Sequence, residues 1–412
     1  MRIAYITPYQ SPSLLRQRPV MQSRSLATTA KVELIASLLR SNGHEVELFS
    51  QGEVIENSFK FYPGFSETER FDSSIPIFYS SAWPIKRVNE FWSCLTLKHL
   101  FNARHREAPF NLVIIWNLKP PHVVCAKHAL RRLRIPVLLE YEDDLFSKLD
   151  GAPAGHSTWR RHSAMALFNQ LAGCMACSPH LLSQLPLNSP KLLLRGVAGK
   201  DLEGAAGMEK VNTVLFSGSH HKQYGIPALI AAWNHAALAG WDLHITGEGP
   251  ETPVFRKLAE SNPAIHFHGL VSRAELVRLM ASAKICINPH DTSKTPGNVF
   301  AFKIIEYLAS GAHVITTPMG VLERELEEGI TYMRDNSAET IATTLRRVIG
   351  ENLHQRTAAQ QVLSVYGPAA VGKSLETFIH RSIAEFEKRD VPCTRCGCHE
   401  AGKLSSSSSS SI

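Results

Sequence analysis

The chain has 412 residues, of which 44% are hydrophobic, 20% are charged and eight are cysteines, and its formal net charge is +7. These values are typical of a globular protein with two or three domains and free thiols. No window of the sequence holds the ~18 uncharged apolar residues that a membrane-spanning helix needs, so we expect no such helix. Because the start also lacks a secretory pattern, we expect a cytoplasmic protein, at most peripheral at the inner face of a membrane. The positive charge suits an anionic partner, but no nucleic-acid-binding motif accompanies it, so we expect no nucleic acid partner.

Strand and helix patterns alternate along the first half of the chain. Strands are expected at Arg2–Pro8, 45–49, 112–116, 136–141, 173–177 and 191–194, and helices at 31–41 and 122–133. Such alternation predicts a mostly parallel sheet. We therefore expect a Rossmann-like domain over residues 1–197.

A second domain and a tail follow. Small, polar and glycine-rich residues at 198–210 predict a linker, and a second Rossmann-like domain is expected over residues 211–362. The apolar periodicity of residues 369–389 predicts a last helix. Residues 390–412 are rich in Cys and Ser and cannot bury a core, so we expect a disordered tail.

The segment at residues 296–318 carries the most chemical information. Gly297 and Asn298 can turn tightly with free backbone N–H groups, and residues 299–310 then read as a short helix. A glycine-containing loop before a helix N-terminus is a natural cradle for a diphosphate. Glu306, about two turns along that helix, can accept hydrogen bonds from a ribose diol. An ordinary loop–helix–strand unit would show the same pattern.

Several motifs in the second half of the chain occur in the same order as in one enzyme family. Residues 216–225 resemble the loop that opens its second domain, residues 243–251 resemble its Gly-x-Gly-Pro-Glu turn, and residues 265–283 resemble its next strand and helix. Its signature Lys-x-x-Glu-Tyr-x-Ala-x-Gly is matched by Lys303, Glu306, Tyr307, Ala309 and Gly311. Over about residues 211–345 the chain thus resembles the retaining glycosyltransferases of the GT-B fold, glycosyltransferase family 4 (group 1).

This resemblance implies an α/β protein of the GT-B fold, with two Rossmann-like domains facing across a cleft and the helix 369–389 crossing back onto the first domain. It implies a hexosyltransferase that moves a sugar from a nucleoside diphosphate sugar to a saccharide or lipid-linked acceptor. The transfer is expected to proceed with retention, in glycan, polysaccharide or glycolipid synthesis. No cofactor is expected to be required, because backbone donors and lysines can neutralise the diphosphate.

Some positions depart from the family pattern. The usual Arg and Lys of the loop that opens the second domain are replaced by Ser219 and Tyr224, and the first Glu of a Glu-x7-Glu pair is replaced by Asn298. A glycine pair of the first domain is absent near Thr28. Two alternatives therefore stay open, a catalytically weak binding or scaffold subunit and a GT-B sugar-nucleotide epimerase.

The resemblance places the donor on a set of loop and helix residues in the second domain. The expected donor-binding residues are Gly218, Lys222, Gly247, His268, Gly297, Asn298, Val299, Phe300 and Glu306. Lys303 is the expected catalytic cation, whereas Lys222 is either a second phosphate ligand or a surface lysine. Asn298 either binds a sugar hydroxyl or caps the helix, and the side chain of His268 either contacts the base or is structural.

Acidic residues follow the expected strand at 136–141. Asp143 and Asp144 are expected in the catalytic site, where they would hold an acceptor hydroxyl or position a neighbouring cation at the end of the sheet. The alternative is a solvated acidic turn that caps the next helix.

Two further segments leave alternatives open. Aromatic and basic residues are interleaved at 75–101, which suits either an anionic membrane surface or an ordinary helix with a basic face. The tail holds four soft ligands that form a weak zinc candidate, although no metal is expected to be needed: Cys393, Cys396, Cys398 and His399.

Overall fold

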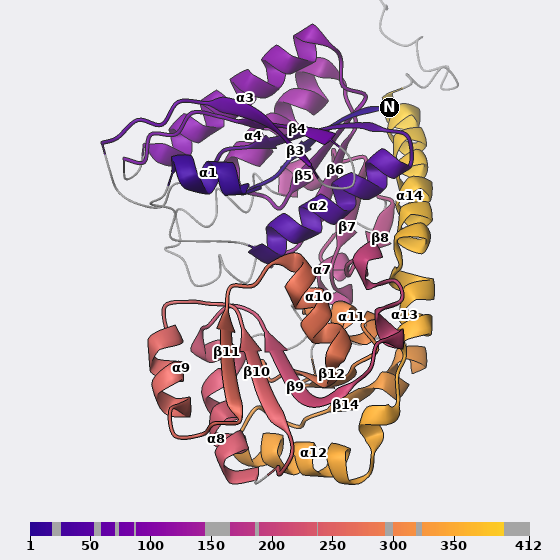
Figure 1. The fold of residues 1–412 in the computed structure, drawn as a ribbon. Coiled ribbons are helices and arrows are strands. Elements are labelled where there is room, and N and C mark those ends of the chain that lie inside the picture. Colours follow the sequence, from indigo (N-terminus) through magenta and orange to yellow (C-terminus); the bar gives the residue numbers. More distant parts are fainter. Residues whose placement is uncertain are drawn as a thin grey trace, which may run out of the picture.

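The computed structural model describes residues 1–18, 26–52, 59–70, 74–85, 88–144, 165–185, 189–236, 238–292, 300–318 and 324–390. In these parts of the chain the strands form two sheets, each covered by helices on both faces (Figure 1). The expected α/β fold with two parallel-sheet domains is confirmed. None of the described helices is long and apolar enough to cross a bilayer.

The first sheet has the strand order β3-β4-β2-β1-β5-β6-β7-β8. Its strands are β1 (Arg2–Ile6), β2 (Glu45–Ser50), β3 (Phe65–Arg70), β4 (Ser74–Tyr79), β5 (Leu112–Trp116), β6 (Val137–Tyr141), β7 (Gly173–Ala176) and β8 (Lys191–Leu193). Neighbouring strands are parallel except β3 and β4. The helices of this domain are α1 (Pro12–Gln17), α2 (Leu26–Ser41), α3 (Asn89–Glu107), α4 (Pro120–His128), which continues into a π-helical turn (Ala129–Leu133), and α7 (Pro179–Ser183).

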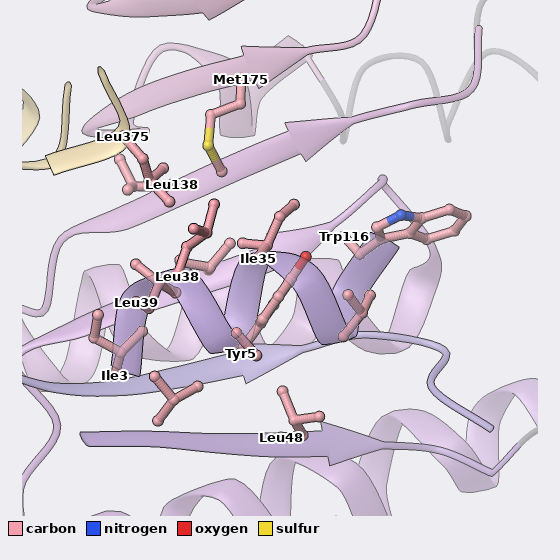
Figure 2. Close-up of a cluster of buried hydrophobic side chains, with 14 of the residues drawn as sticks. Ile3, Tyr5, Ile35, Leu38, Leu39, Leu48, Trp116, Leu138, Met175 and Leu375 are labelled. Carbon is pink, nitrogen blue, oxygen red and sulfur yellow. The ribbon is translucent and has the colours of Figure 1, made fainter. Parts of the chain in front are cut away.

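The central strand β1 is apolar from Ile3 to Ile6, where both of its faces are buried. Ile3 and Tyr5 belong to one core cluster, whereas Ala4 and Ile6 belong to the cluster on the opposite face. Figure 2 shows Ile3 and Tyr5 beside side chains of α2 such as Ile35. A parallel strand that is buried on both faces has a continuous apolar pattern, which is why the local sequence predicts this strand.

The second sheet has the strand order β11-β10-β9-β12-β13-β14, and all its pairs are parallel. Its strands are β9 (Val211–Ser217), β10 (Asp242–Thr246), β11 (Ile265–Gly269), β12 (Ala283–Asn288), β13 (His313–Thr316) and β14 (Ile330–Tyr332). Its helices are α8 (Ile226–Ala236), α9 (Thr252–Ala259), α10 (Arg273–Ser282), α11 (Lys303–Ala309), α12 (Ala338–Gly350) and α13 (Ala359–Tyr366).

The last helix, α14 (Pro368–Asp390), starts beside the second domain and packs along the first, as Figure 1 shows. The Nδ2 of Asn42 donates a hydrogen bond to the carbonyl of Gly372 at 3.0 Å. Near the other end of the helix, the guanidinium of Arg389 donates to the carbonyl of Leu171 at 3.0 Å. These contacts tie a helix that follows the second domain in sequence to the first domain in space.

Some local predictions differ from the structure. The segment at 75–101 holds the strand β4 before the helix α3, because Ile75, Ile77 and Tyr79 alternate into the core while β4 pairs with β2. The helix predicted at 31–41 begins earlier, at Leu26. Pairing with β2 and β3 stabilises β4, whereas the first turn of α2, residues 26–30, carries no apolar periodicity that would indicate a helix.

A glycine ends the strand β11 and directly follows the strands β9 and β10, and the backbones of these three glycines approach one another closely. The amide of Gly247, after β10, donates to the carbonyl of Gly269 at 2.8 Å, and the amide of Gly218, after β9, donates to the carbonyl of Thr246 at 3.3 Å. Gly247 has φ +103°, and a Cβ added to it would lie 2.0 Å from the carbonyl oxygen of Gly218. Only glycine fits this position, because any side chain would push the two strand ends apart.

We predict that Gly247→Ala destabilises the second domain far more than Gly240→Ala. Both glycines have positive φ, but a Cβ on Gly240 would meet nothing within 4 Å. Backbone strain alone costs about 1 kcal/mol at Gly240, whereas strain and overlap together cost about 2–5 kcal/mol at Gly247. Urea unfolding of both variants measures the difference, and equal shifts of the transition midpoint would contradict the close approach of the strand ends.

Candidate active site

The ammonium of Lys303 lies at the carboxyl end of the second sheet. Lys303 is the first residue of α11, and its Nζ donates a hydrogen bond to the carbonyl of Ser217 at 3.1 Å. The same Nζ is 4.4 Å from the ring centroid of Phe216 and 5.8 Å from that of Tyr224. A Cβ on Gly218 would lie 3.3 Å from Nζ, so this glycine leaves space above the cation. Burial lowers the pKa of Lys303 to about 7.

The carboxylate of Glu306 is buried in the first turn of α11, where it is held by an arginine. Its Oε1 accepts a hydrogen bond from Nη1 of Arg273 at 2.5 Å. Arg273 also donates from Nε and Nη2 to Asp201, at 2.6 and 3.1 Å. Burial raises the pKa of the Glu306 carboxyl, and the charge of Arg273 opposes that rise. A buried carboxylate is stable when it is paired and hydrogen-bonded in this way.

Sequence reasoning missed Arg273 and Asp201. Arg273 opens the helix α10 after its N-cap Ser272, inside the segment that resembles the family. Nothing in its spacing shows that it faces a glutamate 33 positions later. The contact exists because β11 and α10 return the chain to the same end of the sheet as α11.

The helix α11 begins later than predicted. Its N-cap position is Phe302, so the expected start at 299 and the alternative that Asn298 caps this helix are wrong, and Glu306 lies in its first turn instead of two turns along. The physical reason is tertiary packing. Phe300 is buried with the guanidinium of Arg195 5.6 Å from its ring centroid, and a Cβ on Gly196 would lie 2.1 Å from the ring of Phe302. Of the expected site residues, Gly297, Asn298 and Val299 lie outside the described residues, as do the tail ligands Cys393, Cys396, Cys398 and His399.

Two other expected donor-site residues are exposed at the same end of the sheet. The side chain of Lys222 is 79% exposed, and its Nζ is 3.8 Å from Oε1 of Glu251. The imidazole of His268 packs against that of His244, with 4.8 Å between ring centroids. Neither side chain is fixed by a short hydrogen bond of the kind that positions Lys303 and Glu306.

The acidic residues after β6 are positioned by an asparagine. Nδ2 of Asn117 donates to Oδ2 of Asp143 at 2.9 Å, and Oδ1 of Asn117 accepts from the amides of Glu142 and Asp143 at 2.7 and 3.1 Å. Asp143 is exposed, whereas Oδ2 of Asp144 is 3.2 Å from Nε2 of His180. An exposed carboxylate with a fixed backbone can bind a hydroxyl group from solution.

A buried ion cluster lies directly behind these residues. The ammonium of Lys31 is 2.5 Å from Oε1 of Glu142 and 3.5 Å from Oε1 of Glu140, and Tyr5 donates its hydroxyl to Glu140. Burial raises the pKa of the Glu142 carboxyl, and Lys31 opposes the rise. Sequence reasoning missed this cluster, although a lysine within the apolar pattern of a helix is a signal of a buried partner.

The two domains meet beside this cluster. Sγ of Cys177, just after β7, is 3.7 Å from the carbonyl of Glu142, and the backbone of Phe300 is within hydrogen-bonding reach of the same thiol. The carboxyl end of the first sheet therefore adjoins the segment that leads into α11. Ligands of open α/β sheets bind at such ends.

Comparison with known proteins agrees with this architecture. Residues 211–351 match the family model for glycosyl transferases group 1. Sucrose-phosphate synthase from Thermosynechococcus elongatus has a similar structure, with a TM-score of 0.70 and 16% identity over 93% of this chain and 99% of that chain. The catalytic domain of starch synthase IV from Arabidopsis thaliana, bound to ADP and acarbose, has a TM-score of 0.62 and 10% identity over 93% and 99%. The Anabaena protein HepE in complex with UDP has a TM-score of 0.61 and 14% identity over 92% and 100%. No curated protein matches the chain in sequence.

At these sequence identities the solved structures establish the fold. The family match assigns the second domain to the glycosyl transferases group 1. The predicted enzyme class is thereby confirmed. The chain is a glycosyltransferase of the GT-B fold whose second domain, over residues 211–351, is of the glycosyl transferases group 1 type.

Proposed function

We propose that this enzyme transfers a sugar from a nucleoside diphosphate sugar to an acceptor, with retention. The observation that carries the proposal is that Lys303 and Glu306 lie on one turn of α11 at the carboxyl end of the second sheet. A cation for the diphosphate and a carboxylate for the ribose are the two groups that such a donor requires. The proposed donor domain is 211–362, and the proposed acceptor domain is 1–197 with the helix 369–389.

The cation and the carboxylate have distinct roles. The ammonium of Lys303 neutralises the diphosphate as negative charge develops on it in the transition state. Glu306 accepts hydrogen bonds from the ribose diol, and Arg273 acts as a positioning residue that keeps this carboxylate ionised and oriented. The complexes of HepE with UDP and with UDP-glucose support a donor of this chemical class.

On the acceptor side, Asp143 and Asp144 hold the acceptor hydroxyl near the donor. The bond between the acceptor oxygen and the sugar carbon forms on the face from which the diphosphate leaves, and the leaving phosphate oxygen takes the acceptor proton. This route needs no strong protein base, and it requires no metal because backbone donors and Lys303 compensate the phosphate charge.

We predict that Glu306→Gln weakens nucleotide binding by about 1–3 kcal/mol, the range for a lost charge-assisted hydrogen bond. UDP, ADP and GDP would first be screened by thermal shift, and the affinity of the best nucleotide would then be measured by calorimetry. The matched control is Glu275→Gln, since Glu275 pairs with Arg278 on the exposed face of α10. Unchanged affinity in a folded Glu306→Gln protein would contradict the donor site.

We predict that Lys303→Ala lowers kcat by about 100-fold, the scale for losing one charge-stabilising donor. Lys222→Ala should cost much less, because Lys222 is solvated beside Glu251. Steady-state kinetics with the donor from the screen measures both variants. A larger loss at Lys222 would reverse the assignment of the two lysines.

The pH dependence of donor affinity provides a second test of the role of Lys303. Since the pKa of Lys303 is lowered to about 7, the free enzyme loses the ammonium charge as the pH rises through 7. Affinity for UDP-glucose, whose phosphates do not titrate in this range, should fall between pH 6 and pH 8. The slope should disappear in Lys303→Met, and an equal slope in that variant would assign the effect to another group.

We also propose that the first domain contacts an anionic membrane surface that presents a lipid-linked acceptor. One face of α3 carries exposed apolar side chains, with Phe91 65% exposed, and Phe59 nearby is 87% exposed. The ring of Trp92 lies between Phe61 and Trp83, at centroid distances of 6.1 and 5.7 Å. Nζ of Lys60 is 5.1 Å from the ring centroid of Tyr62, and Lys98 lines a pocket together with Trp92 and Leu95. Exposed aromatic groups beside lysines match an interface between anionic headgroups and acyl chains.

We predict that binding to vesicles rises with their content of anionic lipid and falls with salt, because such attraction is screened over ~10 Å at 0.1 M. The double variant Phe59→Ser/Phe91→Ser should bind at least about tenfold more weakly, since it removes two exposed apolar groups that would be buried in the bilayer. Val254→Ser/Leu258→Ser is the matched control, because these exposed apolar residues lie on α9 of the other domain. Equal sedimentation with neutral and anionic vesicles at low salt would contradict this surface.

A further inference from the structure

Three potential metal ligands gather on one face of the strands β10 and β11. Leu243 and Ile245 of β10 point into the core. The alternate residues Asp242 and His244 therefore point to the opposite face. His244 pairs in register with His266 of the edge strand β11, so their side chains lie next to each other.

The ligand atoms of this face are close enough to share one ion. One ligand atom each of Asp242, His244 and His266 lies within 4.8 Å of the others. Nε2 of His266 is 3.3 Å from Oδ1 of Asp242, and the ring centroids of His244 and His266 are 5.0 Å apart. Two ligands of one zinc ion stand about 3.4 Å apart at bond lengths near 2.1 Å. Small rotations of the exposed Asp242 and His266 side chains would bring the ligand atoms to the spacing that zinc requires.

A ring nitrogen of His244 also lacks a hydrogen-bond partner among the described residues, which suits a role as a metal ligand. This atom, Nδ1, is buried, which is costly unless another partner satisfies it.

We propose that Asp242, His244 and His266 bind a divalent late transition-metal ion, with Zn²⁺ as the best match. Imidazole nitrogens with one carboxylate oxygen favour zinc, copper or nickel over magnesium or calcium. The site is separate from Lys303 and Glu306, and it does not depend on the proposed sugar transfer.

The position of the site indicates a structural role. His244 lies three residues before Gly247, which follows β10, and His266 lies three residues before Gly269, which ends β11. An ion bound between them would cross-link the edge strand β11 to β10 directly behind the close approach of those glycines. Metal binding should therefore stabilise the second domain.

The test is a titration of the chelator-treated full chain with Co²⁺, followed by visible absorption and by calorimetry with Zn²⁺. The chain carries Cys393→Ser, Cys396→Ser and Cys398→Ser, so that tail thiols do not contribute. We expect saturation at one ion per chain, no thiolate charge-transfer band, and a higher melting temperature with Zn²⁺. His244→Ala and His266→Ala should each weaken binding at least about tenfold.

The matched control is His235→Ala, which removes an exposed histidine on α8 and should leave binding unchanged. Circular dichroism of each metal-free variant checks that it is folded, and Asp242→Asn provides a ligand variant that keeps both histidines. The absence of saturable Co²⁺ absorption would overturn the proposal. So would equal affinity in the His244→Ala, His266→Ala and His235→Ala proteins.

Discussion

The hydrogen bonds between α11 and the last residue of β9 fix the geometry on which the candidate active site depends. Lys303 and Tyr307 are one helical turn apart and therefore lie on the same face of α11. Nζ of Lys303 donates to the carbonyl of Ser217 at 3.1 Å, and the amide of Ser217 donates to the hydroxyl of Tyr307 at 2.8 Å. With these two residues fixed, Glu306 is directed to Arg273 instead. The spacing of lysine, glutamate and tyrosine thus places a cation at the strand end and a carboxylate on the adjacent face.

The segment that leads into α11 is in contact with residues of both domains. Phe300 and Phe302 precede the helix, and they pack against Arg195 and Gly196, which follow the first sheet. Cys177 links the same segment to the acidic residues after β6. A change in the angle between the domains would therefore move α11 relative to the acidic residues after β6. In the proposed mechanism, this coupling would close the site around bound substrates.

Each end of the proposed site contains a buried carboxylate with a basic partner. Glu306 is paired with Arg273, and Glu142 is paired with Lys31. In both pairs burial raises the pKa of the carboxyl and the cation opposes the rise. Buried pairs of this kind contribute little net stability, but removing one partner is costly. Their effect is to hold charged side chains in one orientation at the places where a polar substrate would bind.

The sequence by itself determined the elements whose patterns are local. The strand at 112–116 was predicted with the bounds that the structure shows, because a strand buried between helices has a short, continuous apolar run. The second-domain motifs also indicated the enzyme class. Only the tertiary structure decided that α11 begins at Lys303, that Arg273 holds Glu306, and that His244 stands beside His266. These features depend on contacts between segments far apart in the chain, and neither side-chain spacing nor local propensity records which segments will meet.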